Sequence, residues 1–96
     1  MTYKNTNKRD GNEKEIIAFF IKAGASMVQG SIGQGYDLLV LYRGLLHVVE
    51  IKMPSERKHL TESEKSLKHM AESHGIAYNV ITSVEEAAAL ISQEIA

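Results

Sequence analysis

The 96-residue sequence predicts an α/β fold, an α/β sandwich with a mixed central sheet in the order helix, three strands, helix, strand, helix. Three observations predict it. Residues 12–23 carry apolar side chains at helical spacing, and two runs rich in Leu, Val and Tyr flank Arg43 and Gly44. Capping-box sequences at 61–64 and 83–86 each open a further helical pattern, and a strand pattern at 76–81 lies between these two helices.

The first predicted helix, residues 12–23, ends at Gly24. Asn12 or Asp10 could cap its start. Glu13 and Glu15 both fall in the first turn, where the helix dipole favours anions, so local structure alone accounts for either acid. The expected apolar stripe consists of Ile16, Ile17, Phe20 and Ile21.

A short strand at 25–30 leads into a glycine-rich segment at 30–35. Because this segment connects two strands rather than a strand and a helix, it is not expected to bind a nucleotide. Gly33 and Gly35 are expected either to allow the close approach of a nucleic-acid backbone or to let the chain turn tightly.

Residues 35–52 predict an antiparallel hairpin around Arg43 and Gly44. If the loop has two residues, Asp37 lies directly opposite Glu50, with their Cβ atoms roughly 5 Å apart. Lys52 shares that face of the strand. A three-residue loop would instead place Asp37 opposite Ile51, so the pairing of the two acids depends on the turn.

Two carboxylates placed side by side repel, and in a partly apolar setting they hold a proton unless a positive charge lies between them. A divalent cation is the natural candidate. The structural alternative is an ion-paired cluster of Asp37, Glu50 and Lys52 at the end of the sheet. Pro54 stops the second strand and the glycine-rich segment precedes the first, so both acids lie toward one open edge of the hairpin.

The remaining elements carry clear start signals. Thr61 to Glu64 has capping-box spacing, which is a complete local explanation of Glu64. The helix that follows is expected to end at Gly75 and to bury Leu67, Met70, Ala71 and His74. The last helix is expected to bury Val84, Ala87, Ala88, Ile91 and Ile95.

Composition predicts one domain over residues 1–96, with residues 1–9 as a flexible basic arm. The chain has no cysteine, and no apolar run approaches the ~20 residues of a membrane span, so a cytoplasmic protein without membrane association is expected. The net charge of −1 argues against bulk electrostatic binding of nucleic acid. All eleven Lys and Arg lie in residues 1–70, which must supply any phosphate-binding surface.

The four histidines, at 47, 59, 69 and 74, include no pair three or four residues apart, so zinc is not favoured. Without thiolates, the available ligands are carboxylate and carbonyl oxygens. These ligands suit Mg²⁺ or Mn²⁺.

The order of Glu15, Gly35-Tyr36-Asp37, Glu50-Ile51-Lys52 and LTESE at 60–64 resembles the PD-(D/E)XK nuclease superfamily. Within that superfamily it is similar to the small stand-alone VRR-NUC domains common in phages. The resemblance extends from about Lys8 to Ile95 and includes the KRDGNEKEI opening and the ITSVEEAAALI ending. Two positions depart from the family pattern. Tyr36 stands where proline is usual, and Glu64 stands where many members have glutamine.

The resemblance implies a restriction-endonuclease-like α/β sandwich and metal-dependent hydrolysis of DNA. Asp37, Glu50 and the Ile51 carbonyl would bind Mg²⁺ or Mn²⁺, and Glu15 would bind it directly or through water. Lys52 would orient or deprotonate the attacking water and stabilise the transition state. The products would carry 5′-phosphate and 3′-hydroxyl ends. The residues expected to contact DNA are Lys8, Arg9, Gly33, Gln34, Gly35, Arg57, Lys58 and Lys65.

Three functions are consistent with these residues. The first is a structure-selective endonuclease acting on branched or four-way DNA, a Holliday-junction resolvase, in the cytoplasm of a bacterial or phage-infected cell. Symmetric cutting of two strands needs two active sites, so a homodimer is expected. The second is a catalytically idle DNA-binding or assembly subunit, which the intact Asp37, Glu50 and Lys52 argue against. The third is a nuclease with another substrate, such as a restriction-like enzyme, which the absence of a separate reading module disfavours.

Overall fold

The computed structural model describes residues 11–31 and 33–92, and in this part of the chain the elements follow the predicted order. The helices are α1 (Asn12–Ala23), α2 (Glu62–Ser73) and α3 (Val84–Ser92), with a short 3₁₀ helix, η2 (Pro54–Glu56), before α2. The strands are β1 (Ser26–Gln29), β2 (Leu38–Tyr42), β3 (Leu45–Ile51) and β4 (Tyr78–Ile81). The basic arm predicted for residues 1–9, the possible cap Asp10 and the expected core residue Ile95 lie outside the described residues.

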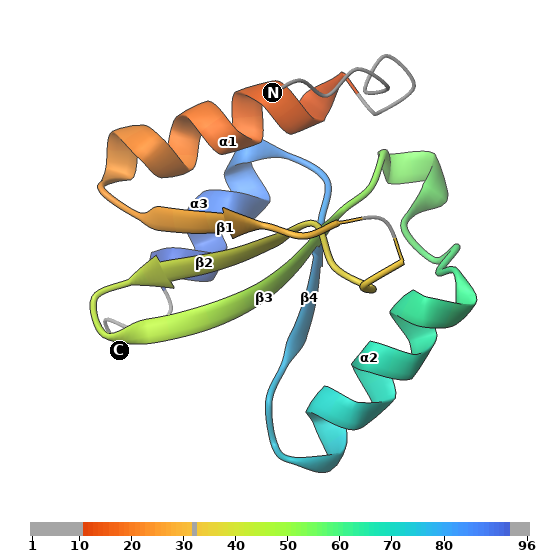
Figure 1. Ribbon diagram of the computed structural model, residues 1–96. Helices are drawn as coiled ribbons and strands as arrows, with labels where there is room; N and C mark the ends of the chain where they lie inside the picture. The colour runs from red at the N-terminus through yellow and green to blue at the C-terminus, as the bar shows by residue number, and fades with distance from the viewer. Residues whose placement is uncertain (1–10, 32, 93–96) are drawn as a thin grey trace.

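The four strands form one mixed sheet in the order β1-β2-β3-β4 (Figure 1). The first three strands are antiparallel, and β4 runs parallel to β3 after the crossover through α2. The predicted α/β class with a mixed sheet is therefore confirmed.

The hairpin turn has the two residues that the sequence predicts. Tyr42 pairs with Leu45, so Arg43 and Gly44 alone form the connection. Both have positive φ, 50° and 82°, as a type I′ turn requires. The turn therefore fixes the register of the whole hairpin.

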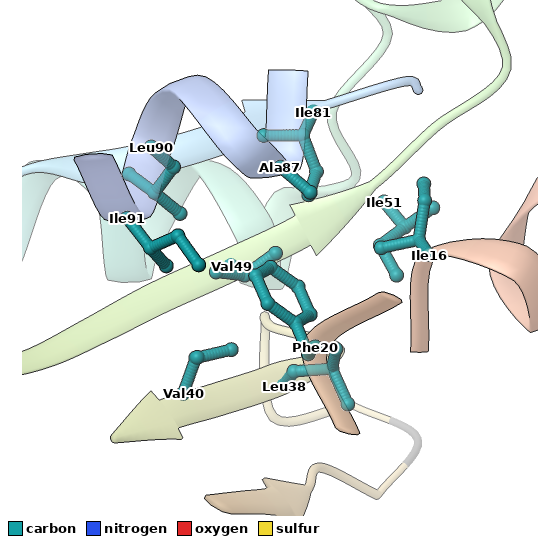
Figure 2. Close-up of a cluster of buried hydrophobic side chains, with 10 residues drawn as sticks. All are labelled: Ile16, Phe20, Leu38, Val40, Val49, Ile51, Ile81, Ala87, Leu90 and Ile91. Atoms are coloured by element: carbon teal, nitrogen blue, oxygen red, sulfur yellow. The ribbon is translucent and has the colours of Figure 1, made fainter. Parts of the chain in front are cut away.

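The core lies between one face of the sheet and the pair α1 and α3. Alternate residues of β2 and β3 point to this face, and Phe20 of α1 is completely buried against them (Figure 2). The buried cluster consists of Ile16, Phe20, Leu38, Val40, Val49, Ile51, Ile81, Ala87, Leu90 and Ile91. Leu90 is a core residue that the sequence pattern did not single out.

Helix α2 differs from the prediction. Ala71 is buried and Leu67 is half-buried, but Met70 is 54% exposed and His74 is exposed. The reason is that α2 packs mainly along β4, at one side of the sheet (Figure 1). A helix held along a single edge strand buries a narrower stripe than one laid across a sheet.

Two expectations for α1 were also wrong. Ile21 is 62% exposed, because the helix buries the side centred on Ile16 and Phe20. Asn12 does not cap the helix; the cap position is Gly11, and no side-chain cap bond forms there within the described residues. No helix in the described ranges is long and apolar enough to cross a membrane.

Candidate functional site

Asp37 and Glu50 meet at the end of the hairpin away from its turn. Leu38 pairs with Val49, so the next residue on each strand brings Asp37 beside Glu50. The Asp37 amide donates to the Val49 carbonyl at 2.9 Å, and the Asp37 Oδ2 accepts from the Ile51 amide at 2.7 Å. Asp37 therefore holds the β3 backbone on both sides of Glu50, and the register predicted from the two-residue turn is confirmed.

Glu50 is 4% exposed, which is unusual for an acid. Burial raises its pKa first, the neighbouring Asp37 and Glu64 add to this effect, and Lys52 opposes it. Together they raise the pKa of Glu50 to about 9 from its ordinary value of 4.5. Without a metal ion, Glu50 therefore keeps its proton at neutral pH.

Lys52 is the cation of this cluster. Its Nζ lies 3.0 Å from Glu64 Oε1 and 3.7 Å from Glu50 Oε2, and its side chain is 15% exposed. Burial lowers the pKa of Lys52, but the carboxylates of Glu64, Glu50 and Asp37 outweigh it and the net pKa is raised. Lys52 is therefore an ammonium held among three acids.

Glu64 has two roles, of which the sequence predicted one. The capping box forms as expected: the Glu64 amide donates to Thr61 Oγ1 at 3.2 Å, and the Thr61 amide donates to Glu64 Oε1 at 2.8 Å. The same carboxylate also binds Lys52, so the local explanation of Glu64 was incomplete. Burial raises its pKa, but the Thr61 amide, Glu50 and Lys52 together lower it.

The acids open onto a pocket of about 390 Å³ between the glycine-rich segment, the end of the hairpin and the start of α2. Its lining consists of Gly30, Ser31, Gly33, Gly35, Tyr36, Asp37, Glu50, Thr61, Ser63 and Glu64. The pocket therefore unites the three sequence segments that carry the acids and the capping box.

Gly35 packs closely against α2 at this pocket. It is buried with φ of 90°, and a Cβ at this position would lie 2.6 Å from the Ser63 carbonyl oxygen. Its carbonyl accepts from the Tyr78 hydroxyl at 2.5 Å, and burial, followed by Glu50, Glu64 and Asp37, raises the pKa of Tyr78. Gly35 therefore serves the turn and its packing on α2, which is one of the two roles expected for it, and it also lines the pocket.

Glu15 is not brought into the site. It is exposed on α1, and the pocket lining does not include it. From the same helix turn, Asn12 reaches the end of β3: its Nδ2 donates to the Lys52 carbonyl at 3.0 Å and to the Thr82 carbonyl at 2.8 Å. Asn12 therefore holds the ends of β3 and β4 together beside the site, a role that its position as a candidate cap did not indicate.

The expected DNA contacts fall into different environments. Arg57 is ion-paired with Glu86 and donates to Thr82 Oγ1 at 3.2 Å, so it fastens the loop before α2 to the start of α3. Lys58 is exposed, and Lys65 lies 3.7 Å from an exposed Glu62. Gly33 and Gln34 are exposed beside the pocket, whereas Lys8 and Arg9 lie outside the described residues.

The chemistry of the donor set fits a hard divalent cation. Three carboxylates, Asp37, Glu50 and Glu64, face one ammonium, so full ionisation would leave an excess of two negative charges. Mg²⁺ commonly uses one or two protein carboxylates and keeps several waters, and Asp37 and Glu50 offer two carboxyl groups at the pocket. Within the described ranges, no three His, Cys, Asp or Glu residues are grouped so that they could hold a metal ion by themselves.

No protein-family model, no curated protein and no solved structure matches this chain. The resemblance to VRR-NUC domains therefore rests on the sequence motifs alone. The geometry of the pocket is a separate observation that does not depend on these motifs.

Proposed function

We propose that this chain is a metal-dependent DNA endonuclease that hydrolyses phosphodiester bonds. One observation carries the proposal: Asp37 and Glu50 lie side by side at one pocket, with the Lys52 ammonium 3.7 Å from Glu50. Phosphodiester hydrolysis near neutral pH needs a cation that activates water and a fixed positive charge for the phosphate. This cluster offers oxygen ligands for the cation and an ammonium as the positive charge for the phosphate.

Asp37, Glu50 and the Ile51 carbonyl would hold Mg²⁺ or Mn²⁺. The ion, when bound, supplies Lewis-acid polarisation of the phosphate and lowers the pKa of bound water. Asp37 already fixes the backbone at Ile51 through its bond to that amide, which keeps the β3 end rigid. Lys52 would stabilise the charge that develops on the phosphate. Glu64 would aim Lys52, because its carboxylate holds the ammonium from the start of α2.

Glu15 has no role in this proposal, since it is exposed on α1, whereas Lys52, which also lies outside the pocket lining, is 3.7 Å from Glu50. The exposed loop at Gly33 and Gln34 borders the pocket, and Lys58 and Lys65 are exposed on the segments that flank it. These residues are the proposed DNA contacts in the described part of the chain. Branched or four-way DNA is the proposed substrate, with a homodimer supplying two sites for paired cuts.

The test uses the purified full chain on linear, flapped and four-way DNA, with Mg²⁺, Mn²⁺ or EDTA. We expect cutting that needs metal and leaves ends that a DNA ligase can rejoin. Asp37→Asn, Glu50→Gln and Lys52→Ala should each abolish cutting, whereas Lys14→Ala, which removes an exposed lysine of α1, should not. Near wild-type cutting by Glu50→Gln would refute the assignment of Glu50 to the active site. A folded protein that binds but cuts none of these DNAs would favour the idle DNA-binding subunit.

A further inference from the structure

Tyr36 places an aromatic side chain in the wall of the pocket, beside the acids. It directly precedes Asp37 in the chain and lines the pocket together with Glu50. It is the one aromatic residue among the lining residues that the structure describes. Tyr36 also stands where proline is usual in the family that the motifs resemble, so the resemblance implies no role for this ring.

The position of the ring is defined by its contact with Gly30. The Gly30 amide donates to the Asp37 carbonyl at 2.9 Å, so these two residues continue the pairing of β1 with β2. Alternation from Val28 and Leu39 then places a Cβ at Gly30 on the same face of the sheet as the Asp37 side chain. Such a Cβ would lie 2.9 Å from Cε2 and 3.1 Å from Cδ2 of Tyr36. The ring therefore lies over the Gly30 backbone, on the face that carries the acids.

The acids lie in a recess rather than on an open surface. Glu50 is 4% exposed, and the pocket of about 390 Å³ falls in the size range of sites that enclose small molecules. An intact duplex is too wide to enter such a recess, whereas a single nucleotide has the size of a small-molecule ligand. Enzymes that need one nucleotide of a DNA molecule in a pocket take it out of the base stack or act on single strands. The shape of the site therefore favours a nucleotide that is not stacked in a duplex.

We propose that the pocket binds one unstacked nucleotide of DNA, with its base stacked on Tyr36 and its phosphate facing Asp37, Glu50 and Lys52. The inference deepens the proposed nuclease function and rests on it for the identity of the ligand as DNA. Stacking of a base on an aromatic side chain contributes roughly 5- to 150-fold in affinity. Branched DNA supplies unstacked nucleotides where a strand leaves the duplex, so Tyr36 would select branched DNA over closed duplex.

The rest of the lining indicates that the pocket accepts any base. Arg, Lys, Asn and Gln are the side chains that recognise purine edges through paired hydrogen bonds. None of these types occurs among the described lining residues, which apart from Tyr36 and the three acids are glycines, serines and Thr61. The Thr61 hydroxyl already accepts the capping bond from the Glu64 amide. Every base has a π face, so binding through Tyr36 should depend little on sequence.

Tryptophan fluorescence tests the stacking directly. The chain has no tryptophan, so Tyr36→Trp introduces a single reporter. We expect saturable quenching by single strands of about 12 nucleotides, equally by dA and dT strands, and by a duplex with one unpaired nucleotide. A blunt, fully paired duplex should quench much less. The measurements are made in EDTA and again in Mg²⁺ directly after mixing.

Leu46→Trp is the control reporter, because Leu46 is 55% exposed near the turn of the hairpin, away from the pocket. It should not be quenched by any of these DNAs. Equal quenching of the two reporters overturns the proposal. So does equal quenching of Tyr36→Trp by paired and unpaired DNA, or no quenching of it in either buffer.

Two further variants test the ring without a larger side chain. Tyr36→Phe keeps the ring, whereas Tyr36→Leu keeps an apolar cover over Gly30 and loses the stacking surface. By fluorescence anisotropy, Tyr36→Leu should weaken binding of the duplex with one unpaired nucleotide about 10-fold or more, and Tyr36→Phe by about 3-fold or less. Tyr42→Leu is the matched control, since Tyr42 is also half-buried and lies at the other end of β2.

The preference for unpaired over fully paired DNA separates stacking from a structural role of Tyr36. A merely structural residue would lower the melting temperature measured by circular dichroism and leave this preference unchanged, and that result for Tyr36→Leu overturns the proposal. Quenching of Tyr36→Trp by DNA that the wild type never cuts, in Mg²⁺ or Mn²⁺, would refute the nuclease function and leave the nucleotide site. Metal-dependent cutting by Tyr36→Leu with wild-type KM on branched DNA would refute the nucleotide site and leave the nuclease.

Discussion

In metal-free buffer, Glu50→Gln should stabilise the protein at pH 8 and remove most of the pH dependence of its stability. The pKa of Glu50 rises from 4.5 in an ordinary setting to about 9 in the folded protein. Between these values the folded state keeps a proton that the unfolded chain releases, so the free energy of unfolding falls as the pH rises. The slope is at most about 1.4 kcal/mol per pH unit, which gives roughly 2–3 kcal/mol between pH 6 and pH 8.

Thermal unfolding followed by circular dichroism in EDTA at pH 6, 7 and 8 measures this effect. For a chain of this size, 1 kcal/mol corresponds to about 4–8 °C in the melting temperature, so the wild type should lose roughly 10 °C or more across this range. Glu50→Gln should lose much less, because its amide does not titrate. Adding Mg²⁺ at pH 8 should raise the melting temperature of the wild type alone, since an ion that binds only the folded state stabilises it.

Glu85→Gln is the control, because Glu85 is an exposed acid on α3 outside the pocket. It should change stability by about 0.5 kcal/mol or less and keep the wild-type pH slope. If Glu50→Gln showed the same pH slope as the wild type, the buried proton would reside elsewhere. The assignment of Glu50 as the strained acid of the site would then be wrong.

Three further outcomes are expected. Asp37→Asn should leave the fold intact but abolish the rise in melting temperature with Mg²⁺, as measured by the same thermal scans. Gly35→Ala should cost roughly 2–3 kcal/mol in urea unfolding, because its φ is positive and its Cβ would strike the α2 backbone; Gly33→Ala, with similar φ and open space, should cost about 1. Thr61→Ala should cost about 1 kcal/mol by the same measurement, whereas Glu64→Gln should keep the capping bond and lose only the attraction to Lys52.

The parts of the fold that the sequence predicted are those fixed by local chemistry. Arg43 and Gly44 set a two-residue turn, and that turn set the hairpin register as far as Asp37 and Glu50. Thr61 marked the start of α2 because its capping box uses only residues within one helical turn. The exposure of Met70 could not be predicted from local chemistry, because it depends on how much of the sheet α2 covers.

The bonds of side chains to residues distant in sequence could not be predicted, for a related reason. Arg57 is expected to contact phosphate, and its ion pair with Glu86 could not be predicted, because it joins residues 29 positions apart and no spacing rule connects them. Asn12 matched the cap pattern, yet its amide reaches carbonyls 40 and 70 residues away. A residue that its sequence neighbours already explain can still bond to residues far away in the sequence. The pattern of neighbouring residues does not reveal such a bond.

Glu15 and Glu64 have similar local settings but different tertiary environments. Both are acids in the first turn of a helix, where the dipole favours them, so local physics treats them alike. The difference is where each helix begins. The loop after β3 returns the start of α2 to the end of that strand, and the capping box turns Glu64 inward onto Lys52. On α1 the buried side is that of Ile16 and Phe20, and Glu15 is left exposed. The helix-borne acid of this pocket is therefore the capping residue of α2, because a cap bond aims a carboxylate at the helix start and the fold brings that start to the lysine.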